Sequence, residues 1–146
     1  MRVFIDTGGW VAYFDKADRY HDVIHAYFEE VLRKRYPHLI TSDYILDETV
    51  TYLRYHTGYA AAVLAFNIIH DLAKAGIIEW LTVNDAIIQR AGAILMQYAD
   101  QKFSFTDCTS FALCEREHIK HAVAVDKHFQ IMQLVLLPLD LQSQIG

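Results

Sequence analysis

Residues 3–9 read Val-Phe-Ile-Asp-Thr-Gly-Gly, and this stretch decides the fold. Three apolar residues followed by turn-forming residues are typical of a short buried strand. Asp6 would then stand at the carboxyl end of that strand. Because open α/β sheets bind their ligands beyond the carboxyl ends of the strands, we expect Asp6 to lie in a functional site.

Strand-like and helix-like segments alternate along the rest of the chain. Further strands are expected at 39–41, 77–83, 121–125 and 134–137. Helical spacing of apolar residues predicts helices at 10–14, 21–35, 44–55, 59–74, 85–98, 107–117 and 127–131. Hydroxyl, amide or carboxylate side chains can cap three of these helices, namely Ser42 or Asp43, Asn84 and Thr106. We therefore predict one α/β domain over residues 1–146, a three-layer α/β/α sandwich with a mainly parallel central sheet.

The composition suits a cytoplasmic protein with a large core. Hydrophobic residues make up 53% of the chain and charged residues 21%. No apolar run approaches the roughly 20 residues that cross a bilayer, and the first residues lack a signal-peptide pattern. Cys108 and Cys114 lie six apart in one expected helix, where they point to different sides, so we expect no disulfide.

The net charge of −5 argues against a protein that coats nucleic acid, because such binding depends on Lys and Arg. The objection is weaker for an enzyme that binds divalent cations, since the cations themselves attract phosphate.

Three further acids are expected to reach the same place as Asp6. Asp126 follows the apolar run 121–125, which would bring it to the same edge of a parallel sheet. Glu48 and Asp107 have the spacing of the apolar, core-facing stripes of their helices. Asp107 would also lie in a first helical turn, where the helix dipole favours the ionised carboxylate. The sequence thus predicts four carboxylates that point inward.

Carboxylates that are buried together repel one another unless protons or cations intervene. Their hard oxygen atoms suit Mg²⁺ or Mn²⁺, which bind through a few carboxylates and keep several water molecules. A cation of this kind activates water and stabilises a leaving oxygen in phosphodiester hydrolysis. We therefore predict that Asp6, Glu48, Asp107 and Asp126 are both metal ligands and catalytic residues.

Four short motifs, each containing one of these acids, follow one another along the chain: Val-Phe-Ile-Asp-Thr at 3–7, Asp-Glu-Thr at 47–49, Phe-Thr-Asp at 105–107 and Ala-Val-Asp-Lys-His-Phe at 124–129. Together they resemble the PIN domain family, and most closely the VapC-type toxins of bacterial toxin–antitoxin pairs. The resemblance covers nearly the whole chain. It implies Mg²⁺- or Mn²⁺-dependent endonucleolytic cleavage of RNA, a homodimer, and a small antitoxin protein as partner.

By position, the resemblance assigns the family's main acids to Asp6, Glu48 and Asp107, and its fourth, more variable acid to Asp126. It also implies that Thr106 supports the third acid through a hydrogen bond or a metal-bound water. One departure is the pair of glycines at 8–9, where such proteins often carry Ser or Asn. Glycine here suggests a close backbone approach.

Other interpretations remain open at this point. A HAD-like phosphatase would need a second acid two residues after Asp6, where this chain has Gly8, and a receiver domain would need a different order of acids and lysine. A PIN-like nuclease of RNA processing outside a toxin system, or a non-catalytic PIN-like binding module, would share the fold. Lys127 and His128 could contact phosphate or transfer a proton, but a solvated turn explains them equally well, and we leave them out of the catalytic set.

Overall fold

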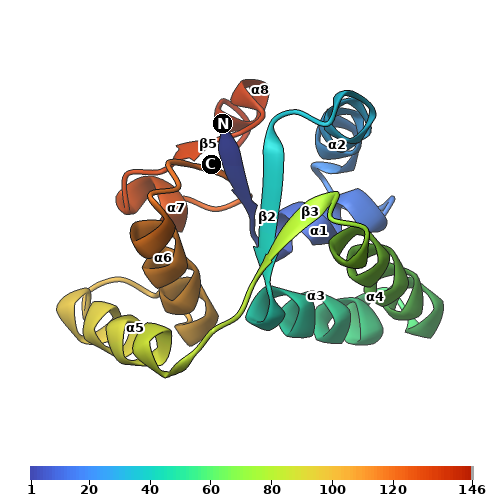
Figure 1. Ribbon diagram of the computed structural model, residues 1–146. Helices are drawn as coiled ribbons and strands as arrows, with labels where there is room; N and C mark the ends of the chain where they lie inside the picture. The colour runs from blue at the N-terminus through green and yellow to red at the C-terminus, as the bar shows by residue number, and fades with distance from the viewer. Residues whose placement is uncertain (146) are drawn as a thin grey trace.

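The computed structural model describes residues 1–145, apart from the side chain of Gln142. Its centre is a sheet of five parallel strands in the spatial order β3-β2-β1-β4-β5 (Figure 1). The strands are β1 (Arg2–Ile5), β2 (His38–Ser42), β3 (Ile78–Leu81), β4 (His121–Val123) and β5 (Val135–Leu136). The expected parallel sheet is therefore confirmed, and each strand overlaps the apolar run that predicted it.

Helices cover both faces of this sheet (Figure 1). The bounds are α1 (Thr7–Phe14), α2 (His21–Lys34), α3 (Asp43–His56), α4 (Tyr59–Lys74), α5 (Asp85–Gln97), α6 (Phe105–Glu117), α7 (His128–Ile131) and α8 (Leu139–Gln142). In Figure 1, α5, α6 and α7 lie on one side of the sheet and α1, α2 and α4 on the other. This is the three-layer α/β/α arrangement that the alternating segments predict.

The strand order places the switch point of the sheet at β1. From β1 the chain builds outward to β2 and β3, then returns to add β4 and β5 on the other side of β1. The carboxyl ends of β1 and β4 become neighbours, and the backbone N–H of Asp6 donates a hydrogen bond of 3.0 Å to the carbonyl of Val123. Ligands of open α/β sheets bind at such a switch point.

The close backbone approach expected at the two glycines is present. Helix α1 begins directly after Asp6 and lies against the end of β4. A Cβ atom on Gly9 would lie only 2.9 Å from the carbonyl oxygen of Val123, and one on Gly8 would overlap the Val125 side chain. Because glycine has no Cβ, it lets α1 start in contact with β4.

Most of the core is apolar, and its polar members are mostly paired. Phe4, Ile5 and Phe28 are among the side chains that are fully buried between the layers. The indole N–H of Trp10 in α1 donates a hydrogen bond of 3.1 Å to the Thr41 hydroxyl in β2, which satisfies both buried groups.

Several details differ from the sequence-based expectations. Helix α1 begins at Thr7, three residues before its predicted start, and β4 ends at Val123 instead of residue 125. Ser104 caps α6 in place of Thr106, so the predicted role of Thr106 as helix cap is wrong. The helix α8 was not expected. Cys108 and Cys114 are buried free thiols, as expected, and none of the helices within residues 1–145 is long and apolar enough to cross a membrane.

Candidate metal-binding active site

Asp6 lies at the centre of the candidate site. It follows β1 and holds the N-cap position of α1, but its side chain makes no capping hydrogen bond. Only 4% of the residue is exposed, and its Oδ1 atom accepts no hydrogen bond. A buried carboxylate oxygen without a partner is costly, and such an atom is expected where a ligand supplies the missing contact.

Glu48 approaches from α3. Its helix is capped by Ser42, whose Oγ accepts a hydrogen bond of 3.2 Å from the backbone N–H of Ile45. Because this cap fixes the start of α3, Glu48 faces the core, where it is half-buried. The apolar spacing of the helix predicted this orientation. The hydroxyl of Thr7 donates a short hydrogen bond to Glu48 Oε1. Thr7 thereby ties the start of α1 to α3.

Asp107 is held by the start of α6. Ser104 and Asp107 form a capping box, in which the Asp107 N–H donates to Ser104 Oγ at 3.0 Å and the Ser104 N–H donates to Asp107 Oδ2 at 3.1 Å. Nδ1 of His128 lies 3.1 Å from the same Oδ2. Only 8% of Asp107 is exposed, in agreement with the predicted inward stripe.

Asp126 lies in the loop between β4 and α7. Its Oδ1 accepts a hydrogen bond of 2.9 Å from the backbone N–H of His128. The Asp126 side chain is 44% exposed, far more than that of Asp107. Asp126 therefore forms the solvent-facing side of the group.

The four carboxylates lie near enough to act on one another electrostatically. Burial raises the pKa of Asp6 well above its usual value, and the negative charges of Asp107, Asp126 and Glu48 raise it further. Burial is also the main cause that raises the pKa of Glu48 and of Asp107. In these two, hydrogen bonds from the Thr7 hydroxyl and the Ser104 backbone oppose the rise. The structure thus brings together all four acids that the sequence singled out.

Each of these acids leaves one oxygen atom without a hydrogen bond from any residue in the described part of the chain. These atoms, the unpaired oxygens below, are Asp6 Oδ1, Glu48 Oε2, Asp107 Oδ1 and Asp126 Oδ2. For Glu48, Asp107 and Asp126, the other oxygen is fixed by a hydroxyl, a backbone N–H or an imidazole. The chain therefore orients these three carboxylates and leaves one atom of each available.

The donor set fits a hard divalent cation. Within residues 1–145, no three His, Cys, Asp or Glu side chains stand close enough to enclose an ion by themselves. Mg²⁺ does not require such a cage, because it commonly binds through one or two carboxylates and completes its shell with water and substrate phosphate. The unpaired Asp6 Oδ1, buried among three other carboxylates, is the observation that favours a cation here.

Three residues that hold these acids were not assigned a role from the sequence, namely Thr7, Ser104 and His128. The Ser-x-x-Asp spacing of 104–107 is a capping-box pattern and could have revealed Ser104. His128 touches Asp107 across 21 residues of chain, and no local pattern predicts that contact. Thr106 is half-buried in the first turn of α6, and its carbonyl accepts a hydrogen bond of 2.7 Å from the Thr109 hydroxyl. Its supporting role at the third acid stays a prediction.

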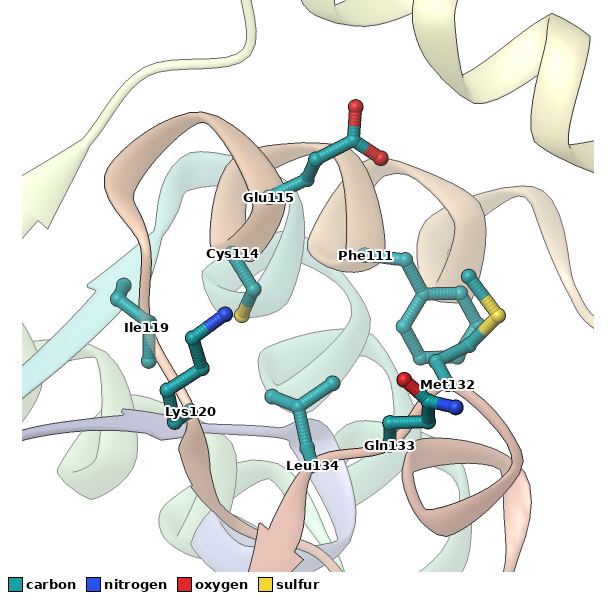
Figure 2. A pocket seen from close by; sticks show the side chains of 8 residues that line it. All are labelled: Phe111, Cys114, Glu115, Ile119, Lys120, Met132, Gln133 and Leu134. Atoms are coloured by element: carbon teal, nitrogen blue, oxygen red, sulfur yellow. The ribbon is translucent and has the colours of Figure 1, made fainter.

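A separate pocket of about 190 Å³ lies beside α6 (Figure 2). Phe111 and Cys114 of α6 line one wall, and Lys120 and Leu134 line another. Lys120 directly precedes β4 and Leu134 directly precedes β5, so the pocket is at the amino ends of these strands. Asp126 follows the carboxyl end of β4, at the opposite edge of the sheet. The pocket is therefore no part of the candidate active site.

Known proteins with similar sequences and structures point to one family. A model of the PIN domain matches residues 3–133. The 23S rRNA-specific endonuclease VapC20 of Mycobacterium tuberculosis is 30% identical over 127 residues, which cover 87% of this chain and 91% of that protein. A VapC ribonuclease of Archaeoglobus fulgidus is 24% identical over 132 residues, which cover 90% of this chain and 81% of that protein.

Solved structures agree with this result. The crystal structure of M. tuberculosis VapC20, described as a sarcin-ricin loop cleaving toxin, superposes with a TM-score of 0.79 and 26% identity, covering 91% of this chain and 96% of that one. VapBC2 from Rickettsia felis, bound to a DNA fragment from its promoter, gives a TM-score of 0.66 at 15% identity, covering 93% of this chain and 97% of that one, and shows the shared fold only. The family model extends from β1 to α7 and includes all four acids, and the chain belongs to the PIN domain family.

Proposed function

We propose that this chain is an endoribonuclease that requires Mg²⁺ or Mn²⁺ and hydrolyses RNA phosphodiester bonds. The observation that carries the proposal is the group of four carboxylates from four different segments, each with one unpaired oxygen. A purely structural role would give no reason to bury Asp6 Oδ1 without a partner. The relatives named as ribonucleases and endonucleases support the same activity.

Asp6, Glu48, Asp107 and Asp126 would hold the cation, one or two of them directly through an unpaired oxygen and the others through water molecules bound to the cation. When bound, Mg²⁺ or Mn²⁺ would lower the pKa of a water molecule and offset negative charge on the phosphodiester. The chain itself supplies orientation. Thr7 fixes one oxygen of Glu48, and the capping box fixes Asp107 at the end of a helix whose dipole favours the anion. Residues 1–146 would provide this site as a single PIN-like domain.

We further propose that the protein is the toxin of a toxin–antitoxin pair and acts in the cytoplasm. This part rests on the VapC relatives, of which the M. tuberculosis VapC20 structure is described as a toxin. A small antitoxin encoded beside the toxin would be the cognate protein partner. A homodimer is supported by large apolar side chains that α3 and α4 leave at the surface, among them Tyr55 at 81% and Tyr59 at 67% exposed.

The nuclease proposal is tested with purified protein and a panel of RNAs that includes transfer RNA, messenger RNA and 23S rRNA. Wild-type protein should cut at least one RNA with Mg²⁺ or Mn²⁺ and should stop when EDTA is added. Asp6→Asn should abolish cleavage, because it replaces the central carboxylate by an amide. Asp71→Asn is the matched control, since the Asp71 side chain is 81% exposed on α4. Cleavage that survives EDTA, or that Asp6→Asn leaves unchanged, would contradict the proposal.

The toxin proposal needs a test in cells. Expression of wild-type protein should arrest growth, whereas Asp6→Asn should not. Co-expression of a short reading frame that abuts the gene should restore growth. A protein that cleaves RNA in vitro without arresting growth would instead be a PIN-like nuclease of RNA processing. A protein that binds a partner but neither cleaves RNA nor arrests growth would be a non-catalytic binding module.

A further inference from the structure

His128 stands between two of the four acids, although it was left out of the catalytic set in the sequence analysis. It is the first residue of α7, directly after the loop that carries Asp126. Its ring Nδ1 lies 3.1 Å from Asp107 Oδ2, and its backbone N–H donates to Asp126 Oδ1 at 2.9 Å. One residue therefore contacts an acid of α6 and an acid of the β4–α7 loop.

The position of the His128 ring is determined by packing as well as by this contact. The ring of Phe103 meets it edge-on with the two centroids 5.2 Å apart. The His128 side chain is only 28% exposed. A ring held in this way presents its Nδ1 to Asp107 with little freedom, as an orienting group should.

The hydrogen bonds on Asp107 decide which of its oxygens remains available. Oδ2 faces two donors, the Ser104 N–H at 3.1 Å and the His128 ring at 3.1 Å. A carboxylate oxygen has two lone pairs in the plane of the group, so these donors use the capacity of Oδ2. Only Oδ1 is then left for a ligand. On Asp126 the backbone N–H of His128 occupies one lone pair of Oδ1 and holds this acid in place, a contact that does not depend on the imidazole.

We propose that His128 is a positioning residue, whose ring orients Asp107 so that Asp107 Oδ1 is the atom offered to a cation, while its backbone N–H holds Asp126 in place. This inference rests on the proposed metal-dependent function and adds a residue to it. It requires a hydrogen atom on Nδ1 of His128, because an ionised carboxylate oxygen only accepts hydrogen bonds. Second-layer donors of this kind fix the geometry of metal ligands in other proteins, and their loss weakens metal binding or activity about 10- to 100-fold.

The first test is Mn²⁺ binding to metal-free protein, measured by titration calorimetry and by the electron paramagnetic resonance signal of free Mn²⁺. His128→Phe keeps a ring beside Phe103 but removes the donor, and it should weaken Mn²⁺ binding about 10- to 100-fold. His128→Asn places an amide N–H close to the former Nδ1 position, and it should bind Mn²⁺ nearly as well as wild type. His70→Phe, on α4 and far from the acids, is the control and should have no effect.

The rescue by asparagine is what separates positioning from packing. If both His128 variants bind Mn²⁺ like wild type, or if His128→Asn is as weak as His128→Phe, the proposal is wrong. Failure of wild-type protein to bind Mn²⁺ would instead contradict the proposed metal-dependent function. Urea denaturation of each variant shows whether a loss of binding reflects a loss of folding.

A second test needs neither metal nor substitution. Nuclear magnetic resonance of wild-type protein with ¹⁵N-labelled histidine reports which ring nitrogen of each histidine carries hydrogen. His128, assigned by its absence from the spectrum of His128→Asn, should carry hydrogen on Nδ1 in the metal-free protein. Finding hydrogen on Nε2 alone would overturn the proposal, whatever the outcome of the Mn²⁺ titrations.

Discussion

Substitution of Gly9 by alanine should separate α1 from β4 and thereby displace Asp6. A Cβ at this position would lie 2.9 Å from the carbonyl oxygen of Val123, whereas ordinary contacts begin at 3.4 Å, a deficit of 0.5 Å. It would also lie 2.9 Å from Val123 Cγ1 and 3.3 Å from Ile5 Cγ2. The Val123 carbonyl cannot easily retreat, because it accepts the backbone hydrogen bond from Asp6.

The expected size of the effect follows from this deficit. Overpacking by one methyl group in a well-packed interior costs about 1–3 kcal/mol of the free energy of unfolding. For a chain of this size, each kcal/mol lowers the melting temperature by about 2–4 °C. A shift of about 1 Å in a catalytic group costs about 100-fold in rate, so half that shift predicts a loss of about tenfold in RNA cleavage.

The assay compares Gly9→Ala with Gly92→Ala, which is the same chemical change in a different setting. A Cβ at Gly92, in the middle of α5, meets no atom within 4 Å. Because alanine favours the helix over glycine, Gly92→Ala should raise the free energy of unfolding by about 0.5–1 kcal/mol. Urea denaturation measures both. If Gly9→Ala is as stable as wild type and cleaves RNA at the same rate, the reasoning about the close approach of α1 and β4 is refuted.

Three further predictions concern the acids and the helix that holds one of them. The pKa of Asp6 is higher in the folded protein than in the unfolded chain, where it is near 3.9. The protonated carboxyl therefore stabilises the folded state fully at a pH below the unfolded pKa. This stabilisation is lost as the pH rises through the folded pKa. Metal-free protein should therefore be less stable at pH 8 than at pH 5. Asp6→Asn should raise the free energy of unfolding at pH 8 by about 1–3 kcal/mol. Equal dependence of stability on pH in the two proteins would count against this prediction. Mg²⁺ at about 100 times its dissociation constant should stabilise wild-type protein by about 2.7 kcal/mol in thermal unfolding, with EDTA reversing the gain and Asp6→Asn showing little of it. Ser104→Ala should lower the free energy of unfolding by about 1 kcal/mol, whereas Thr106→Val should change it by less than about 0.5 kcal/mol. The reverse ranking in urea denaturation would show that Thr106 is the cap after all.

The arrangement of the acids follows from patterns that a sequence displays. Asp6 and Asp126 each come shortly after an apolar strand, and parallel strands deliver their carboxyl ends to one edge of a sheet. Glu48 and Asp107 lie on apolar helical stripes, which fixes the side they face. What the sequence could not show is that β4 would be inserted beside β1, because strand order depends on packing between distant segments.

The details that escaped prediction depend on contacts between distant residues or on a choice between similar ones. Ser104 and Thr106 are both good helix caps, and only Ser104 stands three residues before Asp107, where the two can bond reciprocally. Strand β4 ends at Val123, and beyond it Val125 packs on Gly8. The contact of His128 with Asp107 requires the loop after β4 to turn back toward α6, which no periodicity encodes.

The position of β4 beside β1 also bears on when the protein becomes active during its synthesis. The four acids are spread from residue 6 to residue 126, and β1 has its partner on one side only until residues 121–123 have left the ribosome. A nascent chain that stops before Asp126 lacks a complete set of ligands and exposes one edge of its first strand. The proposed nuclease would therefore be silent until β4 and Asp126 have emerged, because only then are its first strand paired on both sides and its set of acids complete.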